Sequence, residues 1–220
     1  MAIRRLLQST LSLLAIASSS MGQSGGMEIQ DHLLIRESRR FSHDKEQITY
    51  EGSPYANDQF QPATVHSGDL KFQAVPMRYN IAEDVMEFQI AGTTYLLDPD
   101  PKIARIDMGD EIYFVPKSHR SFYVAHVMGN VSLLSKSVVN LRPPNDLMGI
   151  PAKYGRQPDA YYFLQADNPP AKVTGLKNFL ELIPDKAEQV EKYARKEKIS
   201  FKKESDLKKL VEYVNSLKDL

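Results

Sequence analysis

Apolar and polar residues alternate with a period of two from residue 50 to about residue 142. The alternation is clearest over residues 70–79 and 86–90, and short apolar runs continue to residue 141. Clusters of Gly, Asn, Asp and Pro separate the runs at residues 67–69, 80–84, 91–92, 98–101, 109–110 and 129–130, and such clusters favour turns. The pattern predicts a meander of about six to eight antiparallel strands with one buried and one solvated face. It places Glu87 on the solvated face, opposite Met86 and Phe88.

Residues 143–160 break this pattern. Four prolines, at positions 143, 144, 151 and 158, remove backbone donors that a sheet ladder needs. We therefore expect an irregular segment here. Residues 161–164 then form one more apolar run, which predicts a strand that ends before the turn residues at 167–170.

From residue 174 onward the apolar period changes to 3.6, which predicts three short helices. The first ends before Pro184. In the second, Asp185 is placed as the N-cap, Glu188 completes a D-x-x-E capping box, and the helix runs to about Lys198. Because an isolated helix as short as the third is marginal in water, we expect its apolar face to pack onto the rest of the chain. That face is a stripe of Leu207, Leu210, Val211, Val214 and Leu217.

Together these periods predict an α+β fold. Its main part is a mostly antiparallel β-sheet, arranged as a meander, a sandwich or a partly closed barrel, and a C-terminal cluster of about three short helices follows it. We expect a β-rich domain over residues 50–168 and a helical subdomain over residues 169–220 packed on it. Residues 23–49 are polar and charged, which indicates a partly mobile N-terminal segment.

Residues 1–22 have the order of charge and hydrophobicity of a signal peptide. Arg4 and Arg5 precede an apolar stretch, and small residues follow it. Ser20 and Gly22 fit the pockets of signal peptidase, so we expect cleavage before Gln23. This predicts a secreted protein of the periplasm or the cell surface. We expect no transmembrane anchor in the mature chain, because no later apolar stretch approaches the roughly 20 residues that span a bilayer.

Composition narrows the classes of function. The chain has 28 basic and 28 acidic residues, and cleavage removes only Arg4 and Arg5 from that balance. A chain without an excess of basic residues is not typical of a nucleic-acid binder, so we expect no nucleic-acid partner. The absence of cysteine excludes disulfides, a thiol nucleophile and cysteine-held metals.

Motifs for common chemistries are absent from the sequence. There is no G-x-S-x-G nucleophile elbow, no G-x-G-x-x-G or Walker loop and no EF-hand loop. The histidines at positions 32, 43, 66, 119 and 126 form no H-x-x-x-H or H-E-x-x-H pair. We therefore predict no catalytic residue, no cofactor and no metal site. The separation of two carboxylates is set by the fold rather than by the sequence, so a carboxylate-based hydrolase of envelope polymers stays open as an alternative.

Two stretches carry a family resemblance. GSPYANDQF at residues 52–60 and VPMRYNI at residues 75–81 follow the pattern GSPY-x-ND-x-F … VP-x-RYNI, and the ending over residues 184–217 fits the same family. In these features the chain resembles a family of uncharacterised exported proteins of the Bacteroidota. The resemblance covers most of residues 50–217 and implies export across the inner membrane of a Gram-negative cell. It implies no reaction and no catalytic residue.

The function predicted from these features is that of an exported, non-enzymatic binding or assembly module. Its partner would be an unknown protein or polymer of the cell envelope. Besides the hydrolase, a stress or signalling component whose C-terminal helices dock a partner stays open.

Residues 52–60 are the candidate recognition loop, in which Tyr55, Asn57, Asp58 and Phe60 would face a ligand. The competing interpretation is structural. Tyr55 and Phe60 would then close one end of the β core, while Asn57 or Asp58 bonds its own backbone in an Asx turn. We favour this second interpretation, because buried aromatic side chains contribute strongly to small cores.

Overall fold

The computed structural model describes residues 33, 35–37 and 50–217. The signal-peptide prediction for residues 1–22 and most of the segment 23–49 lie outside the described residues and stay predictions. Eleven strands form one sheet: β1 (Ile35–Glu37), β3 (Gln61–Ser67), β4 (Leu70–Asn80), β5 (Val85–Ile90), β6 (Thr93–Leu97), β7 (Ile103–Met108), β8 (Glu111–Phe114), β9 (Tyr123–Val127), β10 (Val131–Lys136), β13 (Ala160–Gln165) and β14 (Ala171–Lys172).

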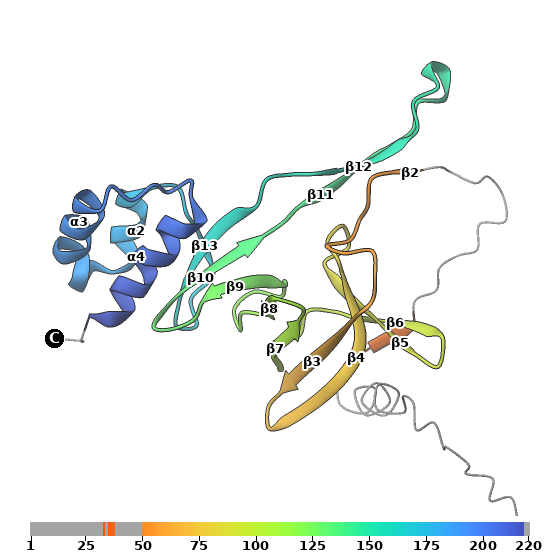
Figure 1. The fold of residues 1–220 in the computed structure, drawn as a ribbon, viewed down its shortest axis with the longest axis horizontal. Coiled ribbons are helices and arrows are strands. Elements are labelled where there is room, and N and C mark those ends of the chain that lie inside the picture. Colours follow the sequence, from red (N-terminus) through yellow and green to blue (C-terminus); the bar gives the residue numbers. More distant parts are fainter. Residues whose placement is uncertain (1–32, 34, 38–49, 218–220) are drawn as a thin grey trace, which may run out of the picture.

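A second, smaller sheet contains β2 (Tyr50–Glu51), β11 (Val139–Arg142) and β12 (Ala152–Arg156). A 3-10 turn, η1 (Asp146–Met148), lies between β11 and β12. The chain ends in helical elements, which are α2 (Leu176–Leu182), the 3-10 turn η2 (Pro184–Lys186), α3 (Ala187–Lys196) and α4 (Glu204–Ser216). In Figure 1 the small sheet projects from the large one, and the helices lie at the opposite end of the molecule.

The large sheet is antiparallel throughout and open, with β1 and β14 at its edges. The predicted α+β class, mostly antiparallel sheet followed by three short helices, is confirmed. The predicted number of strands was too low, because residues 50–142 contain ten. A strand as short as the two-residue β2 has too few positions to show a period of two.

A bulge in β4 explains a change of phase in the sequence. Phe72 is buried, and the buried positions then continue at Val75, Met77 and Tyr79. Between them Ala74 adopts a left-handed φ of 54°, and the register with β3 shifts at the same place. The extra residue turns the second half of β4 by one position, as bulges do, so both halves place their apolar residues in the same core.

The first core lies on the strands β3 to β8. Its largest fully buried members include Phe88, Met77 and Tyr113. The ring of Tyr79 packs edge-on against Tyr113 and Phe122, with ring centroids 5.3 Å and 5.9 Å apart. Such contacts add to the free energy gained from burying aromatic area.

A second core joins the three helices to β10 and β13. Phe163 of β13 contacts Phe179 of α2, with ring centroids 4.2 Å apart. Asn215 of α4 bonds the backbone of Val131 in both directions, accepting from its N–H at 2.9 Å and donating to its carbonyl at 2.8 Å. The predicted packing of the last helix is confirmed, since the stripe residues Leu207, Leu210, Val211 and Val214 are buried in this core.

Two local predictions were wrong. Residues 143–160 are not irregular throughout, because β12 forms between Pro151 and Pro158 and pairs with β11. The prolines therefore bound the strand instead of interrupting it. Asp185 is not an N-cap either. It lies inside η2, and α3 begins at Ala187 with no side-chain cap and ends at Lys196.

Candidate functional site

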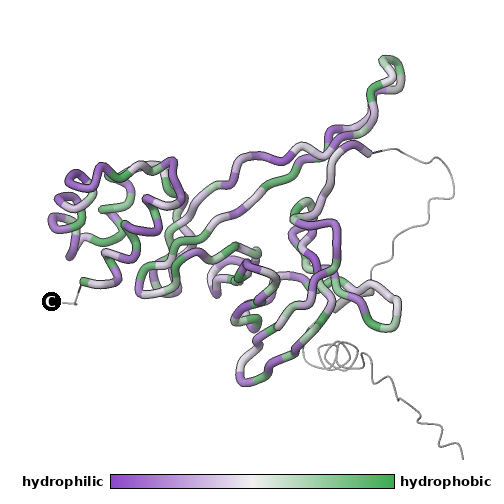
Figure 2. The backbone as a smooth tube through the Cα atoms, in the orientation of Figure 1, coloured by the Kyte–Doolittle hydropathy of each residue, from purple (hydrophilic) through white to green (hydrophobic). Residues whose placement is uncertain are grey.

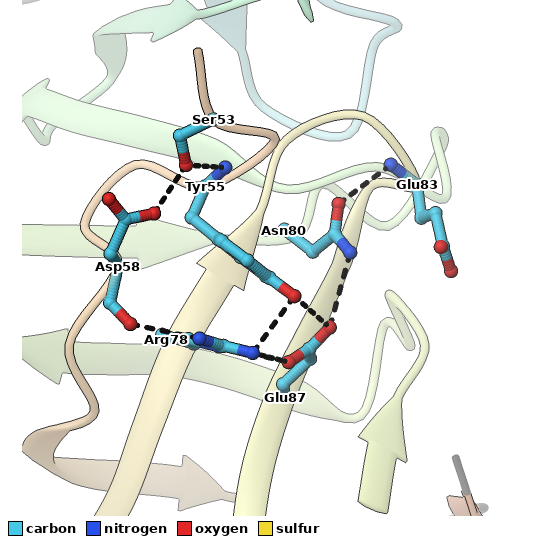
Figure 3. A network of polar contacts seen from close by, with 7 residues as sticks. All are labelled: Ser53, Tyr55, Asp58, Arg78, Asn80, Glu83 and Glu87. Carbon is cyan, nitrogen blue, oxygen red and sulfur yellow. Dashed lines mark hydrogen bonds and ion pairs between the residues drawn. The ribbon is translucent and has the colours of Figure 1, made fainter. Parts of the chain in front are cut away.

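The segment 52–60 lies across β4 and β5 and is fixed there by its backbone. The N–H of Ala56 donates to the carbonyl of Tyr79 at 3.0 Å, and the N–H of Ile81 donates to the carbonyl of Pro54 at 2.8 Å. Figure 3 shows Ser53, Tyr55 and Asp58 of this segment above side chains of the hairpin beneath it. Two backbone bonds at this position hold the segment as an additional layer on the β4–β5 hairpin.

Arg78 of β4 is the centre of this layer. Its guanidinium lies between two rings, 3.7 Å from the Tyr55 centroid and 4.5 Å from the Phe60 centroid. It donates to the backbone carbonyl of Asp58 at 2.8 Å and to the Tyr55 hydroxyl at 2.8 Å. Tyr55 and Phe60 thus hold an arginine by cation–π contact and do not point at an open cavity.

Glu87 of β5 is the partner of Arg78. Its Oε2 accepts from Arg78 Nε at 2.9 Å and from Nη2 at 2.7 Å, while its Oε1 accepts from Tyr55 and Asn80, each at 3.2 Å. The residue is 3% exposed. The prediction that Glu87 lies on a solvated face was wrong, because the segment 52–60 covers that face of β5. The alternation of apolar and polar residues assigns side chains to the two faces of a strand, but it does not show which other segment covers a face.

Asn57 and Asp58 form the exposed end of the segment. Asn57 Oδ1 accepts from the N–H of Gln59 at 2.9 Å, which is the predicted Asx turn. The hydroxyl of Ser53 donates to the Asp58 carboxylate. These bonds are internal to the segment. The geometry around all four candidate residues, Tyr55, Asn57, Asp58 and Phe60, therefore favours a structural role over a recognition loop. The two rings enclose Arg78, however, and do not close an end of the β core as predicted.

A second polar cluster is centred on Asp84, in the turn between β4 and β5. Its carboxylate accepts from Tyr79 at 2.6 Å, Ser121 at 2.5 Å and Lys136 at 2.8 Å. Asp84 has a left-handed φ of 54°, a conformation that short polar residues tolerate. Burial, followed by the Asp84 carboxylate, raises the pKa of the Tyr79 hydroxyl above its ordinary value of 10.0. The cluster keeps Tyr79 as a neutral donor and ties the turn to β10.

Ser135, His126 and Glu204 are arranged in the order of a Ser-His-acid relay, which sequence reasoning missed. His126 Nε2 lies 2.8 Å from Ser135 Oγ, and His126 Nδ1 lies 3.4 Å from a Glu204 carboxylate oxygen. However, Ser135 is 4% exposed, and the hollow beside it has a volume of about 10 Å³. Such a volume holds about one water molecule and no substrate. We interpret the arrangement as a polar link between the sheet and the first turn of α4.

This link predicts a pH dependence of stability. Burial lowers the pKa of His126 from its ordinary value of 6.5, and the Glu204 carboxylate only partly opposes this. The unfolded chain then binds the proton more readily than the folded one, so the free energy of unfolding falls as the pH falls through 6.5. Glu204, whose pKa is lowered mainly by a bond from Lys208, adds a loss only as the pH falls below its ordinary 4.5. Urea unfolding at a series of pH values between 7.5 and 5 measures the effect.

The matched control is His119→Asn, since His119 is exposed. His126→Asn is expected to flatten the stability profile near pH 6, whereas His119→Asn leaves the slope of the parent. An equal slope in the parent and in His126→Asn would contradict the prediction.

The small sheet that projects from the molecule carries the most exposed apolar surface. We call this projection the arm, and it consists of β2 and residues 138–157. Tyr50 of β2 stacks on Tyr154 of β12, with ring centroids 5.5 Å apart. Gly52 has a φ of 75°, and a Cβ there would lie 2.6 Å from the carbonyl oxygen of Tyr154, so only glycine fits this approach. The far turn is closed by two backbone bonds between Asn145 and Ile150, of 2.8 Å and 3.0 Å.

The arm concentrates exposed large hydrophobic side chains. Eight are exposed in the described part of the chain, and six of them belong to the arm: Tyr50, Val138, Leu141, Leu147, Met148 and Ile150. Leu147 is 100% exposed and Met148 is 70% exposed. Figure 2 shows hydrophobic positions at the far turn of the arm. We call Leu147, Met148 and Ile150 the tip.

A cleft of about 520 Å³ lies at the other end of the molecule, between the start of β10, the end of β13 and the helices. Its aliphatic lining comes from Val131, Ile183, Pro184, Val214 and Leu217. Asn130, Gln165, Asp185, Lys186 and Gln189 supply polar groups. Asp185 is the one carboxylate among these described lining residues, so the cleft does not hold the pair of converging carboxylates that a glycoside hydrolase uses.

Over residues 33, 35–37 and 50–217, no three His, Asp or Glu side chains are grouped as metal ligands. None of the helices in this described part is long and apolar enough to cross a membrane.

No protein-family model, curated protein or solved structure matches the chain. The fold itself therefore gives the class: an α+β protein with an open antiparallel sheet, a projecting β-arm and a C-terminal helical cluster.

Proposed function

We propose that this chain is an exported, non-enzymatic binding or assembly module of the cell envelope, in the periplasm or on the cell surface, and that it docks a protein partner through the arm. The observation that carries the proposal is the gathering of six exposed large hydrophobic side chains on one projecting hairpin and its neighbouring strand. Exposed apolar surface gathered in one place is a mark of an interaction site.

The form of the arm favours a protein as the partner. The tip is a closed turn on a two-stranded hairpin, so its backbone is already ordered and little conformational entropy is lost on docking. Such a narrow apolar projection fits a groove better than a flat surface. The charges near it are mixed, since Lys153 pairs with Glu51 at 3.1 Å, which gives no basic patch for anionic lipid or nucleic acid.

The alternatives receive less support. The hydrolase alternative needs a cleft with paired carboxylates, and the described cleft has Asp185 alone. The signalling alternative needs an exposed apolar patch on the C-terminal helices. None of the eight exposed large hydrophobic side chains of the described residues lies on α2, α3 or α4.

The proposal is tested with a photoreactive residue at position 147 in cells that export the chain, with the same residue at the exposed position 71 of β4 as the control. The exported form is identified by its N-terminal mass, which should begin at Gln23. We expect position 147 to crosslink to one defined protein and position 71 not to. The partner, once purified, should bind the variant Leu147→Asp/Met148→Asp at least about tenfold more weakly than the parent.

Both substituted side chains are exposed, so the double variant should melt like the parent. Equal affinity of the variant and the parent for the crosslinked protein would refute docking through the tip. Crosslinks of equal yield at positions 71 and 147 would refute it as well.

A further inference from the structure

The tip and the cleft are complementary and lie at opposite ends of the molecule (Figure 1). The tip offers three exposed aliphatic or thioether side chains, and the cleft has an aliphatic floor that includes Ile183, Val214 and Leu217. The cleft volume of about 520 Å³ is within the range of roughly 300–1,000 Å³ that binding pockets have. The apolar floor of the cleft could therefore bury the exposed apolar side chains of the tip.

The border of the cleft suits a peptide turn. Asn130, Gln165 and Gln189 line it, and carboxamides both donate and accept hydrogen bonds, as backbone amides do. Asp185 and Lys186 contribute one negative and one positive charge, so the border does not repel a nearly neutral partner of either sign. An apolar floor with a polar border is the usual anatomy of a protein–protein contact.

A chain cannot insert its own tip into its own cleft, because the arm and the helices project in opposite directions (Figure 1). The contact must therefore join two molecules. We infer that the partner of the tip is the cleft of a second copy of this chain, so that copies associate head to tail. This inference rests on the proposed role of the arm as a docking element and names its partner.

Head-to-tail association is heterologous, since each interface uses a different surface from each copy. Such an interface leaves one free tip and one free cleft on every dimer, and it continues into a ring or a filament. A contact between two tips would instead stop at the dimer. This difference makes the inference testable with two single variants.

The tip variant is Leu147→Asp and the cleft variant is Gln189→Trp, which fills the cleft from an exposed position on α3. Analytical ultracentrifugation of the parent is expected to show a sedimentation coefficient that rises with concentration beyond that of a dimer. Each variant alone should remain monomeric. Because the tip variant keeps its cleft and the cleft variant keeps its tip, their equimolar mixture should form dimers and nothing larger.

Cysteine pairing gives an independent measurement, because the sequence contains no cysteine. A mixture of Met148→Cys and Gln189→Cys chains should form a disulfide-linked dimer under mild oxidation. A mixture of Met148→Cys and Lys71→Cys chains is the control, since Lys71 is exposed on β4 away from the helices, and it should not form the mixed dimer.

Assembly of the cleft variant alone, as in the parent, would overturn the inference in favour of a contact between tips. A parent chain that stays monomeric at about 1 mM would also overturn it. In that case a photo-crosslink from position 147 to a different protein leaves the proposed docking function standing, whereas the absence of any crosslink from position 147 ends both proposals.

Discussion

Replacing Arg78 by methionine is expected to lower the free energy of unfolding by about 3–5 kcal/mol. Methionine keeps much of the packing between Tyr55 and Phe60 but leaves the Glu87 carboxylate buried without its cation. The Arg78 and Glu87 side chains are 11% and 4% exposed, so solvent does little to compensate. Urea unfolding of the parent and the variant at neutral pH measures the loss.

Two further variants separate this effect from general damage. Arg105→Met removes an exposed arginine that pairs with Asp107 at 3.0 Å, and a surface pair of this kind contributes about 0–1 kcal/mol. The double variant Arg78→Met/Glu87→Leu removes both buried charges and should recover most of the stability, because apolar replacement of a whole buried pair is often neutral or better. A loss in Arg78→Met no larger than that in Arg105→Met would show that the pair is unimportant.

The hairpin was accessible from the sequence, but the register that pairs Arg78 with Glu87 and the burial of that pair were not. A turn over residues 80–84, as the sequence predicts it, would set Arg78 opposite Met86. The observed turn covers residues 81–84 only, which sets Arg78 opposite Glu87. What covers the pair comes from residues 52–60, about twenty residues upstream. A period-two pattern shows which residues lie on each face of a strand, but it does not show whether a distant loop packs on that face. For this reason the sequence placed Glu87 on the solvated face.

The arm shows the same limit. Prolines at positions 143, 144, 151 and 158 suggested an irregular segment, but proline is tolerated beside a strand, and β12 begins directly after Pro151 and ends two residues before Pro158. Nothing in the local pattern shows that Leu147 and Met148 stand in solvent, because hydropathy alone gives neither the path of a loop nor what packs against it. The helices were better predicted, since a 3.6-residue stripe needs only a partner surface, and β10 with β13 provides one.

The second large effect is expected at that partner surface, where Leu210 of α4 is fully buried among residues of β10, β13 and the other helices. Leu210→Asp places a carboxylate in this core without a cation, or forces α4 away from the sheet. Either outcome is expected to lower the free energy of unfolding by about 3 kcal/mol or more. Thermal melting followed by circular dichroism measures the loss, and Lys209→Asp, an exposed neighbour on the same helix, is the matched control.

Comparing these two variants tests whether the helices and the sheet unfold together. Because α4 also bonds the backbone of Val131 through Asn215, the helices share a hydrogen-bonded boundary with β10 as well as an apolar core. We therefore expect Leu210→Asp to lower the melting temperature of the β-sheet signal as well as that of the helical signal. If only the helical signal shifts, the helices fold as a separate unit. A melting temperature of Leu210→Asp equal to that of Lys209→Asp would show that α4 is not held by this core at all.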